Sequence, residues 1–516
     1  MIRRLFVPLV AALILTATAI VPASIPDPVK LDAGLVSGVP STSADVRVFK
    51  GIPFAAPPVG AQRWKAPQPA AKWDGVRQGD QFGPRCMQGG GGQGAQAMSE
   101  DCLYLNVWTA AASASEKRPV MVWSYGGAFT GGAGSLPGYD GEVLARKGVV
   151  VVTYNYRLGP FGWFSHPELT KESGRNASGN YGLMDLVAAL QWVQKNIAAF
   201  GGDAQRVTIF GESAGGALVA ALVGSPEGKG LFQRAISESA SWMGTRMSPM
   251  MTLAEGEEAG LKATAALGAK SLAELRAVSA EQLQKDGRGT RPMIDGWYIK
   301  EDLSTTFAAG RQKEVDVLVG SNKDEGTFAF FGLGRGNSQQ YVSQARERFG
   351  DLADTYLKLY PAGASDDEAH AAERTAFRDE LSWQMRTWAA LQAKRSGKSK
   401  TYVFYFTHEP PVAAGQPNRG ASHTAEIPYV FNIPGRLWTE VDKSLAETMS
   451  SYWTNFAATG DPNGKGLPVW PQYRDKANGR AMILGDKVEA EGSPDTPRLT
   501  LYDSLFAKQL TARRTH

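Results

Sequence analysis

Cysteine is scarce in this chain, since only Cys86 and Cys102 occur among its 516 residues. Two cysteines are too few for a disulfide-dense scaffold or for a four-cysteine metal centre. A short stretch of chain separates them, and a disulfide closes such a loop readily in an oxidising compartment. We therefore expect a Cys86–Cys102 disulfide, with a pair of buried free thiols as the alternative.

A strong charge of one sign is also missing. The 55 Lys and Arg residues nearly balance the 51 Asp and Glu residues, which leaves a formal net charge of +4. Without a basic run the chain has no electrostatic footprint for DNA or RNA, so we expect no nucleic-acid partner. The H-E-x-x-H motif of zinc peptidases and the S-x-x-K motif of β-lactamases are both absent, which disfavours those two chemistries.

A long hydrophobic run occurs at the N-terminus, from Leu5 to Val21, directly after Arg3 and Arg4. A basic start, a short apolar run and small residues at its end are typical of a signal peptide. We expect residues 1–23 to be removed on export, so that residues 24–516 form one secreted or periplasmic domain without stable membrane insertion. The alternative is a membrane anchor, for which the run is short.

Apolar runs bounded by Gly, Pro, Asn or charged residues recur along the chain and predict buried strands at 120–123, 149–154, 207–210, 315–319 and 402–406. Residues 183–200, between the second and third runs, carry apolar residues at helical spacing. This alternation predicts an α/β fold with a mostly parallel central sheet and helices on both faces. Residues 250–284 predict a helical insertion over the C-terminal ends of the strands.

The segment Gly211-Glu212-Ser213-Ala214-Gly215 has the form G-x-S-x-G. It lies between the predicted strand 207–210 and a helix of small residues, 214–223. Its glycines allow a sharp turn from strand to helix that leaves the Ser213 hydroxyl exposed above the strand ends, as in a nucleophile elbow. A turn serine in a Gly-rich loop is the alternative.

A serine nucleophile requires a base, and histidine is the usual one. Surroundings and chain order disfavour three of the five histidines and leave His408, which follows a predicted strand, and His423, which lies in a polar loop. We favour His423 and expect it to ionise near the ordinary histidine pKa of about 6.5. The acid is Asp324 or Glu325 after the strand 315–319, unless these carboxylates belong to a solvated turn.

Several longer segments resemble the signatures of the type-B carboxylesterases, the family that contains the cholinesterases. They are residues 100–107 (EDCLYLNV), 210–216 (FGESAGG) and 322–326 (NKDEG), with further matches at 50–54, 57–60, 155–159 and 180–185. The matches cover nearly all of the chain after the predicted signal peptide. The resemblance implies the α/β-hydrolase fold and an activity on small-molecule esters.

The resemblance also implies roles for single residues. Ser213 is the expected nucleophile, Glu325 the acid and His423 the base. Glu212, beside the serine, is expected to be a further buried carboxylate, and the resemblance again pairs Cys86 with Cys102.

The same family places an oxyanion hole at a triple-glycine segment, here Gly126-Gly127-Ala128. The resemblance implies that the backbone N–H groups of Gly127, Ala128 and Ala214 form this hole. Ala128 departs from the family, because it keeps the N–H group but adds a methyl at the pocket wall.

A second departure concerns specificity. No aromatic residue lies between the two cysteines, where cholinesterases carry a tryptophan that stacks on quaternary ammonium, so a choline ester is not the expected substrate. Four aromatic residues follow the family's pocket positions loosely, and core packing is their alternative role: Trp242, Phe328, Phe330 and Phe331.

These observations together predict a secreted serine carboxylesterase that works through an acyl-enzyme on Ser213 and requires neither a cofactor nor a metal. An amide or carbamate hydrolase with the same residues is one alternative. A non-catalytic, cholinesterase-like binding protein is another. The sequence does not predict the acyl group, the alcohol group or the oligomeric state.

Overall fold

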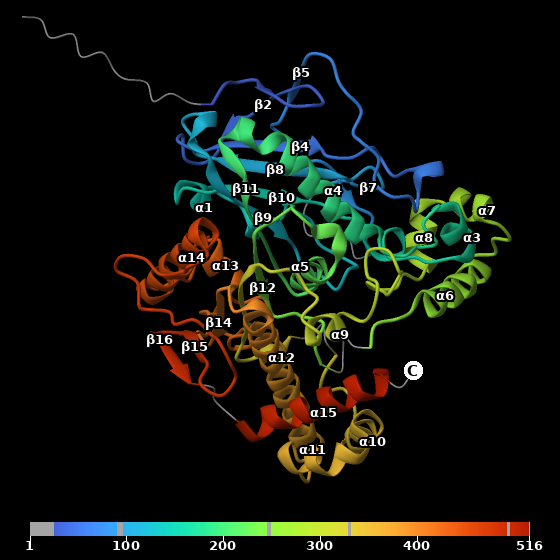
Figure 1. Cartoon of the computed structure of the whole chain (residues 1–516), viewed down its shortest axis with the longest axis vertical. Helices are drawn as coiled ribbons and strands as arrows, with labels where there is room; N and C mark the ends of the chain where they lie inside the picture. The colour runs from blue at the N-terminus through green and yellow to red at the C-terminus, as the bar shows by residue number, and fades with distance from the viewer. Residues whose placement is uncertain (1–24, 90–95, 245–248, 329–331, 493–495, 515–516) are drawn as a thin grey trace, which may run out of the picture.

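The computed structural model describes residues 25–89, 96–244, 249–328, 332–492 and 496–514. The predicted signal peptide, residues 1–23, lies outside them. Within the described residues, eleven strands form one sheet with the order β16-β15-β14-β13-β12-β11-β9-β10-β8-β4-β3 (Figure 1). They are β3 (Val39–Pro40), β4 (Arg47–Pro53), β8 (Tyr104–Thr109), β9 (Arg118–Ser124), β10 (Val150–Tyr154), β11 (Gly202–Glu212), β12 (Arg234–Glu238), β13 (Asp316–Asn322), β14 (Thr401–Phe406), β15 (Arg480–Leu484) and β16 (Val488–Gly492).

The centre of the sheet is parallel, from β15 through β14, β13, β12, β11 and β9 to β10, and antiparallel strands flank it on both edges. The five predicted strands correspond to β9, β10, β11, β13 and β14. Strand β12 was not predicted, because its sequence RAISE contains only Ala235 and Ile236 as apolar residues. Hydrogen bonding on both sides, to β11 and to β13, makes this short segment a strand.

Helices cover both sides of the sheet. In Figure 1 the strands β9 and β11 lie between α14 and the pair α4 and α5. The helix predicted at 183–200 is present as α4 continued by a 3-10 turn, and it ends at Gly201, whose φ of +78° suits glycine. The α-helices of the described residues are α1 (Glu142–Arg146), α2 (Gly159–Gly162), α3 (Pro167–Glu172), α4 (Tyr181–Asn196), α5 (Ala214–Gly224), α6 (Leu253–Ala266), α7 (Leu272–Ala277), α8 (Ala280–Asp286), α9 (Leu303–Ala308), α10 (Ser338–Phe349), α11 (Ala353–Leu359), α12 (Asp366–Ser396), α13 (Ile427–Val430), α14 (Glu440–Thr459) and α15 (Thr496–Arg514).

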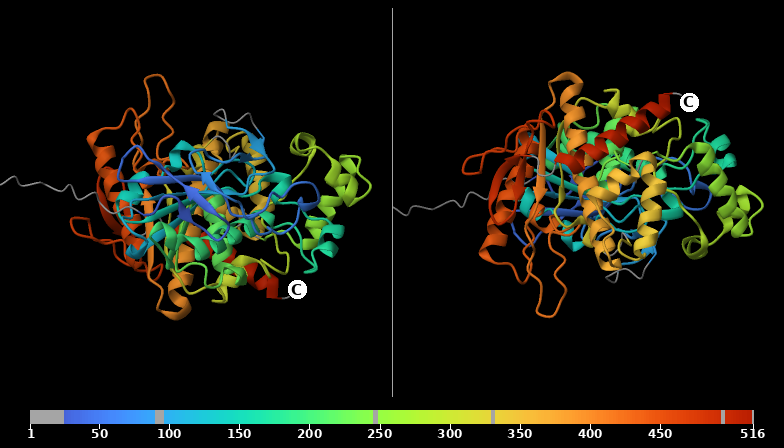
Figure 2. Two further views of the ribbon diagram at one scale, coloured as in Figure 1. Left: turned by 90° about the horizontal axis from the view of Figure 1, so that it is seen from above. Right: turned by 90° about the horizontal axis from the view of Figure 1, so that it is seen from below.

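The predicted helical insertion is confirmed as α6, α7 and α8. Both views in Figure 2 place these helices at the opposite end of the molecule from α14. Gln284 of α8 and the residues that follow it border a cavity together with Gly127, which comes after β9. The insertion therefore reaches the loops at the C-terminal ends of the strands. A second helical group, α10, α11, α12 and α15, was not predicted and lies at the bottom of Figure 1.

The two cysteines form the expected disulfide. Cys86 and Cys102 are bonded to each other, and their Cα atoms lie 5.0 Å apart. Both residues are buried. In the described residues, no helix is long and apolar enough to cross a membrane.

Candidate active site

Ser213 lies at the sharp turn between β11 and α5. Its φ of +53° and ψ of −125° are unusual for a residue with a side chain, and this backbone strain is what a nucleophile elbow requires. The flanking glycines are sterically necessary. A Cβ atom at Gly215 would lie 1.8 Å from the carbonyl oxygen of Ser124, and one at Gly211 would lie 2.6 Å from it. Close packing against Ser124 thus explains why both ends of the G-x-S-x-G pattern are glycine.

Two cavities meet at Ser213. One has a volume of about 260 Å³ and includes Glu212 and Phe328 in its lining. The other, of about 340 Å³, extends past the first turns of α5. His423 borders both cavities, as Ser213 does. A serine hydroxyl and an imidazole therefore face the same enclosed space.

The predicted base contacts a predicted acid. The Nδ1 atom of His423 lies 2.6 Å from Oε2 of Glu325, and both side chains are buried. Glu325 follows the end of β13, and its other oxygen accepts hydrogen bonds from the Asn322 N–H at 2.8 Å and the Ser239 hydroxyl at 2.5 Å. These donors fix the carboxylate, which in turn orients the imidazole. Sequence reasoning missed Ser239, because it comes from the end of the unpredicted strand β12.

Glu212 is the further buried carboxylate that was expected next to the serine. Its Oε1 atom lies 3.1 Å from Nε2 of His423. Burial by itself lowers the pKa of His423, but Glu212 and Glu325 outweigh burial and raise that pKa to about 9. The pKa of Glu212 is also raised, to about 8, chiefly by burial. The pKa of His423 therefore lies above the ordinary histidine value expected from the sequence, and its titration is coupled to that of Glu212.

The structure also separates the alternatives that the sequence left open. Asp324, next to Glu325, points to the neighbouring loop, where its Oδ2 atom accepts a hydrogen bond of 2.9 Å from the N–H of Ala421. His408 borders neither of the two cavities at Ser213. His423 therefore borders the cavities of Ser213 and contacts Glu325, whereas Asp324 and His408 have other partners.

The loop after β9 contributes lining residues to both of these cavities. Gly127 and Ala128 have φ angles of +114° and +52°, and the next residue, Phe129, has +63°. A Cβ atom at Gly127 would lie 2.2 Å from the carbonyl oxygen of Gly131, so no larger residue fits there. Ala128 borders both cavities, and Ala214 borders the larger one at the first residue of α5, where helical N–H groups have no partner within the helix. The three predicted oxyanion residues thus lie around Ser213.

Comparison with known proteins identifies the family of this chain. Residues 26–501 match the model of the carboxylesterase family. The chain belongs to this family. Its members are serine carboxylic-ester hydrolases, so the protein is an enzyme of that class and the resemblance seen in the sequence is confirmed.

Proteins named as esterases are similar to this chain over most of their length. A protein named fumonisin B1 esterase from Sphingopyxis macrogoltabida is 39% identical over 500 residues, which cover 92% of this chain and 90% of that protein. Para-nitrobenzyl esterase from Bacillus subtilis (strain 168) is 36% identical, with 90% and 96% covered. Among solved structures, a PNB esterase at 35% identity gives a TM-score of 0.78, with 93% of this chain and 99% of that chain covered. These structures show the α/β-hydrolase fold.

The aromatic residues singled out in the sequence divide between site and core. Phe328 borders the smaller cavity of this carboxylesterase, and its ring centroid lies 5.4 Å from that of His423. Trp242 is fully buried, and its indole N–H donates to the carbonyl of Ala217, so it belongs to the core. Phe330 and Phe331 lie outside the described residues.

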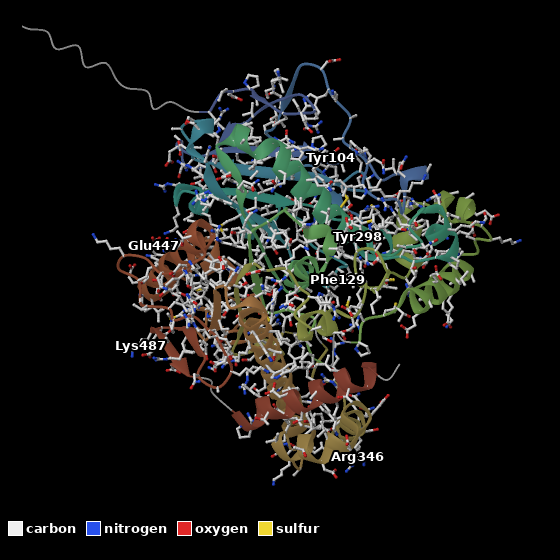
Figure 3. The ribbon with its side chains drawn as sticks, viewed as in Figure 1. Tyr104, Phe129, Tyr298, Arg346, Glu447 and Lys487 are labelled. Atoms are coloured by element: carbon white, nitrogen blue, oxygen red, sulfur yellow. A yellow bond between two sulfur atoms is a disulfide. The ribbon has the colours of Figure 1, made fainter. Side chains whose placement is uncertain are left out.

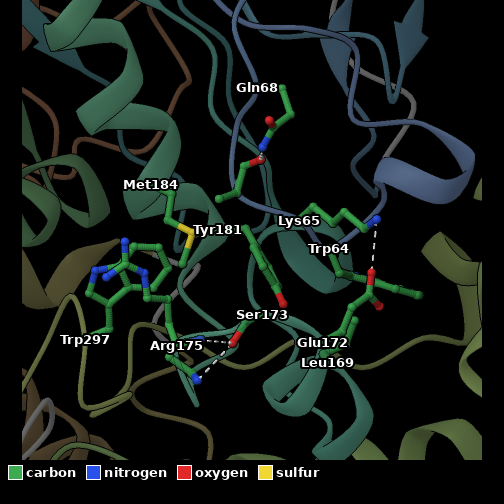
Figure 4. Close-up of a pocket in the computed structure, with 12 residues that line it drawn as sticks. Trp64, Lys65, Gln68, Leu169, Glu172, Ser173, Arg175, Tyr181, Met184 and Trp297 are labelled. Atoms are coloured by element: carbon green, nitrogen blue, oxygen red, sulfur yellow. Dashed lines mark hydrogen bonds and ion pairs between the residues drawn. The ribbon is translucent and has the colours of Figure 1, made fainter.

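Figure 4 shows a separate cavity, which has a volume of about 290 Å³. Trp64, Tyr181 and Trp297 contribute aromatic walls, and the ion pair of Lys65 and Glu172, at 3.0 Å, lies among its lining residues. It shares no lining residue with the two cavities at Ser213 and has no serine–histidine pair. Within the described residues, no group of three or more His, Cys, Asp or Glu side chains is arranged to hold a metal ion.

Proposed function

We propose that this carboxylesterase hydrolyses esters through an acyl-enzyme on Ser213, with His423 as general base and Glu325 as the acid that orients it. The observation that carries the proposal is that Ser213 and His423 border the same cavities while Glu325 contacts the far side of the imidazole at 2.6 Å. Acyl transfer requires a nucleophile, a base and an acid that orients the base, and this placement of the three residues supports those roles.

The reaction then proceeds in two halves. The Ser213 Oγ atom attacks the ester carbonyl carbon while Nε2 of His423 takes the hydroxyl proton. The bond between the carbonyl carbon and the alcohol oxygen breaks, and His423 returns the proton to the leaving alcohol. A water molecule next attacks the acyl-enzyme, gives one proton to His423 and releases the acid. Ser213 recovers its proton from His423, so no cofactor enters the cycle.

The developing negative oxygen needs hydrogen-bond donors that are already in place. We assign this role to the backbone N–H groups of Gly127 and Ala128, in the loop after β9, and of Ala214, the first residue of α5. The positive φ at Ala128 supports the assignment, because a residue with a side chain is held in this conformation only where the surrounding structure requires it.

We also infer that the enzyme is exported, as a single domain of residues 24–516 after removal of residues 1–23. The basic and then apolar start of the chain supports this inference, and so does the disulfide, since such bonds persist in oxidising compartments. A non-catalytic binding role has less support, because the nucleophile, base and acid are all retained.

Replacement of the nucleophile tests the proposal. Ser213→Ala is expected to lower kcat for 4-nitrophenyl butyrate by roughly 10³-fold or more, since the attacking atom is lost. Thermal unfolding should stay close to the parent, because one half-buried hydroxyl is removed. Ser115→Ala, at an exposed serine, serves as the matched control and should change neither value. A Ser213→Ala variant that kept a tenth or more of the parental kcat would overturn the proposal.

A further inference from the structure

The larger cavity at Ser213 contains a cation that ester hydrolysis itself does not require. Most of its wall is apolar or small, with Phe129, Phe377 and Leu381 among its lining residues. Phe129 lies near the centre of the molecule (Figure 3). Arg291 borders the same cavity, whereas no carboxylate is among the described residues that line it. Arg291 therefore places a positive charge in the wall of this cavity.

The backbone on both sides of Arg291 is firmly held. Before it, the N–H of Thr290 donates to the carbonyl of Trp163 at 2.6 Å. After it, the N–H of Met293 donates to the Asn180 side chain at 3.0 Å, and the carbonyl of Met293 accepts from that side chain at 2.9 Å. Pro292 restricts the backbone between these anchors. Arg291 thus projects from a fixed segment, as a residue that positions a ligand should.

A second arginine on the same segment faces the neighbouring cavity. Arg288 is exposed and borders a space of about 610 Å³, which also includes Gly127 in its lining. Gly289, between the two arginines, packs tightly, since a Cβ atom there would lie 2.5 Å from the backbone of Gly159. The segment therefore presents one cation to each of two cavities that border the loop of Gly127 and Ala128.

A guanidinium in such a cavity favours an anionic ligand. Burial lowers the pKa of Arg291, but an arginine stays protonated at every pH at which the protein is folded. The guanidinium has five N–H donors, so it can keep hydrogen bonds to the protein and still offer a two-pronged site to a carboxylate. In a partly enclosed cavity this attraction is stronger than in water, and a neutral group gains less from it.

We propose that the enzyme acts on esters that carry a free carboxylate on the half lying in the larger cavity, and that Arg291 binds this carboxylate. This inference rests on the proposed function, because it places the scissile ester at Ser213. Two kinds of ester share the required chemistry. A half-ester of a dicarboxylic acid carries the carboxylate on its acyl half, and an acyl ester of a hydroxy acid carries it on its alcohol half.

Matched esters test the proposal and distinguish these two kinds. Monoethyl esters of succinate, glutarate and adipate are compared with the same esters whose free carboxylate is replaced by a primary amide of equal size. For the alcohol half, 4-butanoyloxybutanoate is compared with its amide. We expect at least one carboxylate ester to exceed its amide in kcat/KM by about tenfold or more, mainly through a lower KM.

Variants of Arg291 then locate the effect. Arg291→Gln should lower kcat/KM for the preferred carboxylate ester by roughly 10- to 100-fold and that for the amide by less than about threefold, because only the charged partner is lost. Arg291→Lys should recover part of the preference for the carboxylate ester over its amide, since lysine restores the positive charge but not the bidentate hydrogen bonding of a guanidinium. Arg175→Gln, at an exposed arginine that borders the cavity of Figure 4, is the matched control and should change neither ester.

Two outcomes would overturn the proposal while leaving the proposed function in place. One is turnover of 4-nitrophenyl butyrate with no preference for any carboxylate ester over its amide. The other is an equal loss on carboxylate and amide esters in Arg291→Gln, which would make Arg291 a structural residue. An enzyme that hydrolysed none of these esters, 4-nitrophenyl butyrate included, would contradict the proposed function and this proposal together.

Discussion

The surroundings of His408 and of His423 are alike in burial and in acidic partners, but only His423 borders the cavities that contain Ser213. Both imidazoles are buried, with 6% and 3% of their surface exposed. In both residues each ring nitrogen has its own carboxylate partner, at distances between 2.6 and 3.1 Å. By burial and by pairing with acids, either residue would qualify as a candidate catalytic histidine.

The carboxylates at His408 belong to structural hydrogen-bond networks. Asp442, 2.8 Å from its Nε2 atom, also accepts hydrogen bonds from Tyr429 and Thr439, where it caps the start of α14. Asp486 contacts Nδ1 from the loop between β15 and β16. His408 therefore links three segments of the chain, and both of its nitrogens are engaged in doing so.

The region of His423 differs because it borders the cavities of Ser213, the proposed nucleophile. Its Nδ1 atom is held by Glu325, while the ring borders the cavities that also contain Ser213. Acid pairing alone thus does not distinguish a catalytic base from a structural histidine. Access to a reacting group is what distinguishes the two.

The sharpest way to break this comparison is to remove each imidazole in turn. His423→Ala should lower kcat by roughly 10³-fold or more, because Ser213 loses its base. His408→Ala should leave kcat within a few fold but lower the free energy of unfolding by about 1–3 kcal/mol, since Asp442 would lose a buried partner. Ester kinetics and urea unfolding measure the two effects. A large loss of kcat in His408→Ala, with His423→Ala active, would reverse our assignment.

The neighbouring acids offer the next test. Glu325→Gln should lower kcat by about 10²-fold or more, because the amide cannot stabilise the imidazolium that forms. Asp324→Asn should cost less than about tenfold, as an amide oxygen can still accept the N–H of Ala421. The same ester assay ranks the two variants. If Asp324→Asn proved the more damaging, the third member of the triad would have to be reassigned.

A smaller effect is expected in the pH profile. The neutral imidazole is the base, so kcat/KM should rise with pH through the pKa of His423, which the facing carboxylates raise well above the ordinary value of about 6.5. Glu212→Gln removes one of these negative charges at 3.1 Å and should move the rising limb to lower pH. Glu440→Gln, at the exposed start of α14, should leave the limb in place. A parental limb near pH 6.5, or an upward shift in Glu212→Gln, would contradict this picture of the site.

Much of this account could be predicted from the sequence where the chain itself imposes the geometry. The glycines around Ser213 are required by contacts with the strand beside it, so a local pattern reveals the elbow. Long apolar strands and the periodic helix α4 were equally visible. The short strand β12 was not, because its pairing with β11 and β13 comes from tertiary structure.

Other features depend on contacts between distant segments. Residue spacing left Asp324 and Glu325 equivalent, and only the backbone path after β13 turns one side chain to Ala421 and the other to His423. The raised pKa of His423 likewise results from carboxylates that are distant in the sequence, Glu212 at the end of β11 and Glu325 after β13. Arg291 shows no motif in the sequence, and its place beside Ser213 follows from the way the segment after α8 folds back over the site.

The most direct test of the central claim is to locate the adduct of a fluorophosphonate probe by peptide mass spectrometry. The probe bonds to an activated serine, and the account predicts a single adduct on Ser213 that disappears in Ser213→Ala. Ser239 and Ser241 line the same cavity and serve as internal controls that should remain unmodified. An adduct on either of them in the parent enzyme, with Ser213 unlabelled, would contradict the claim that Ser213 is the nucleophile of this carboxylesterase.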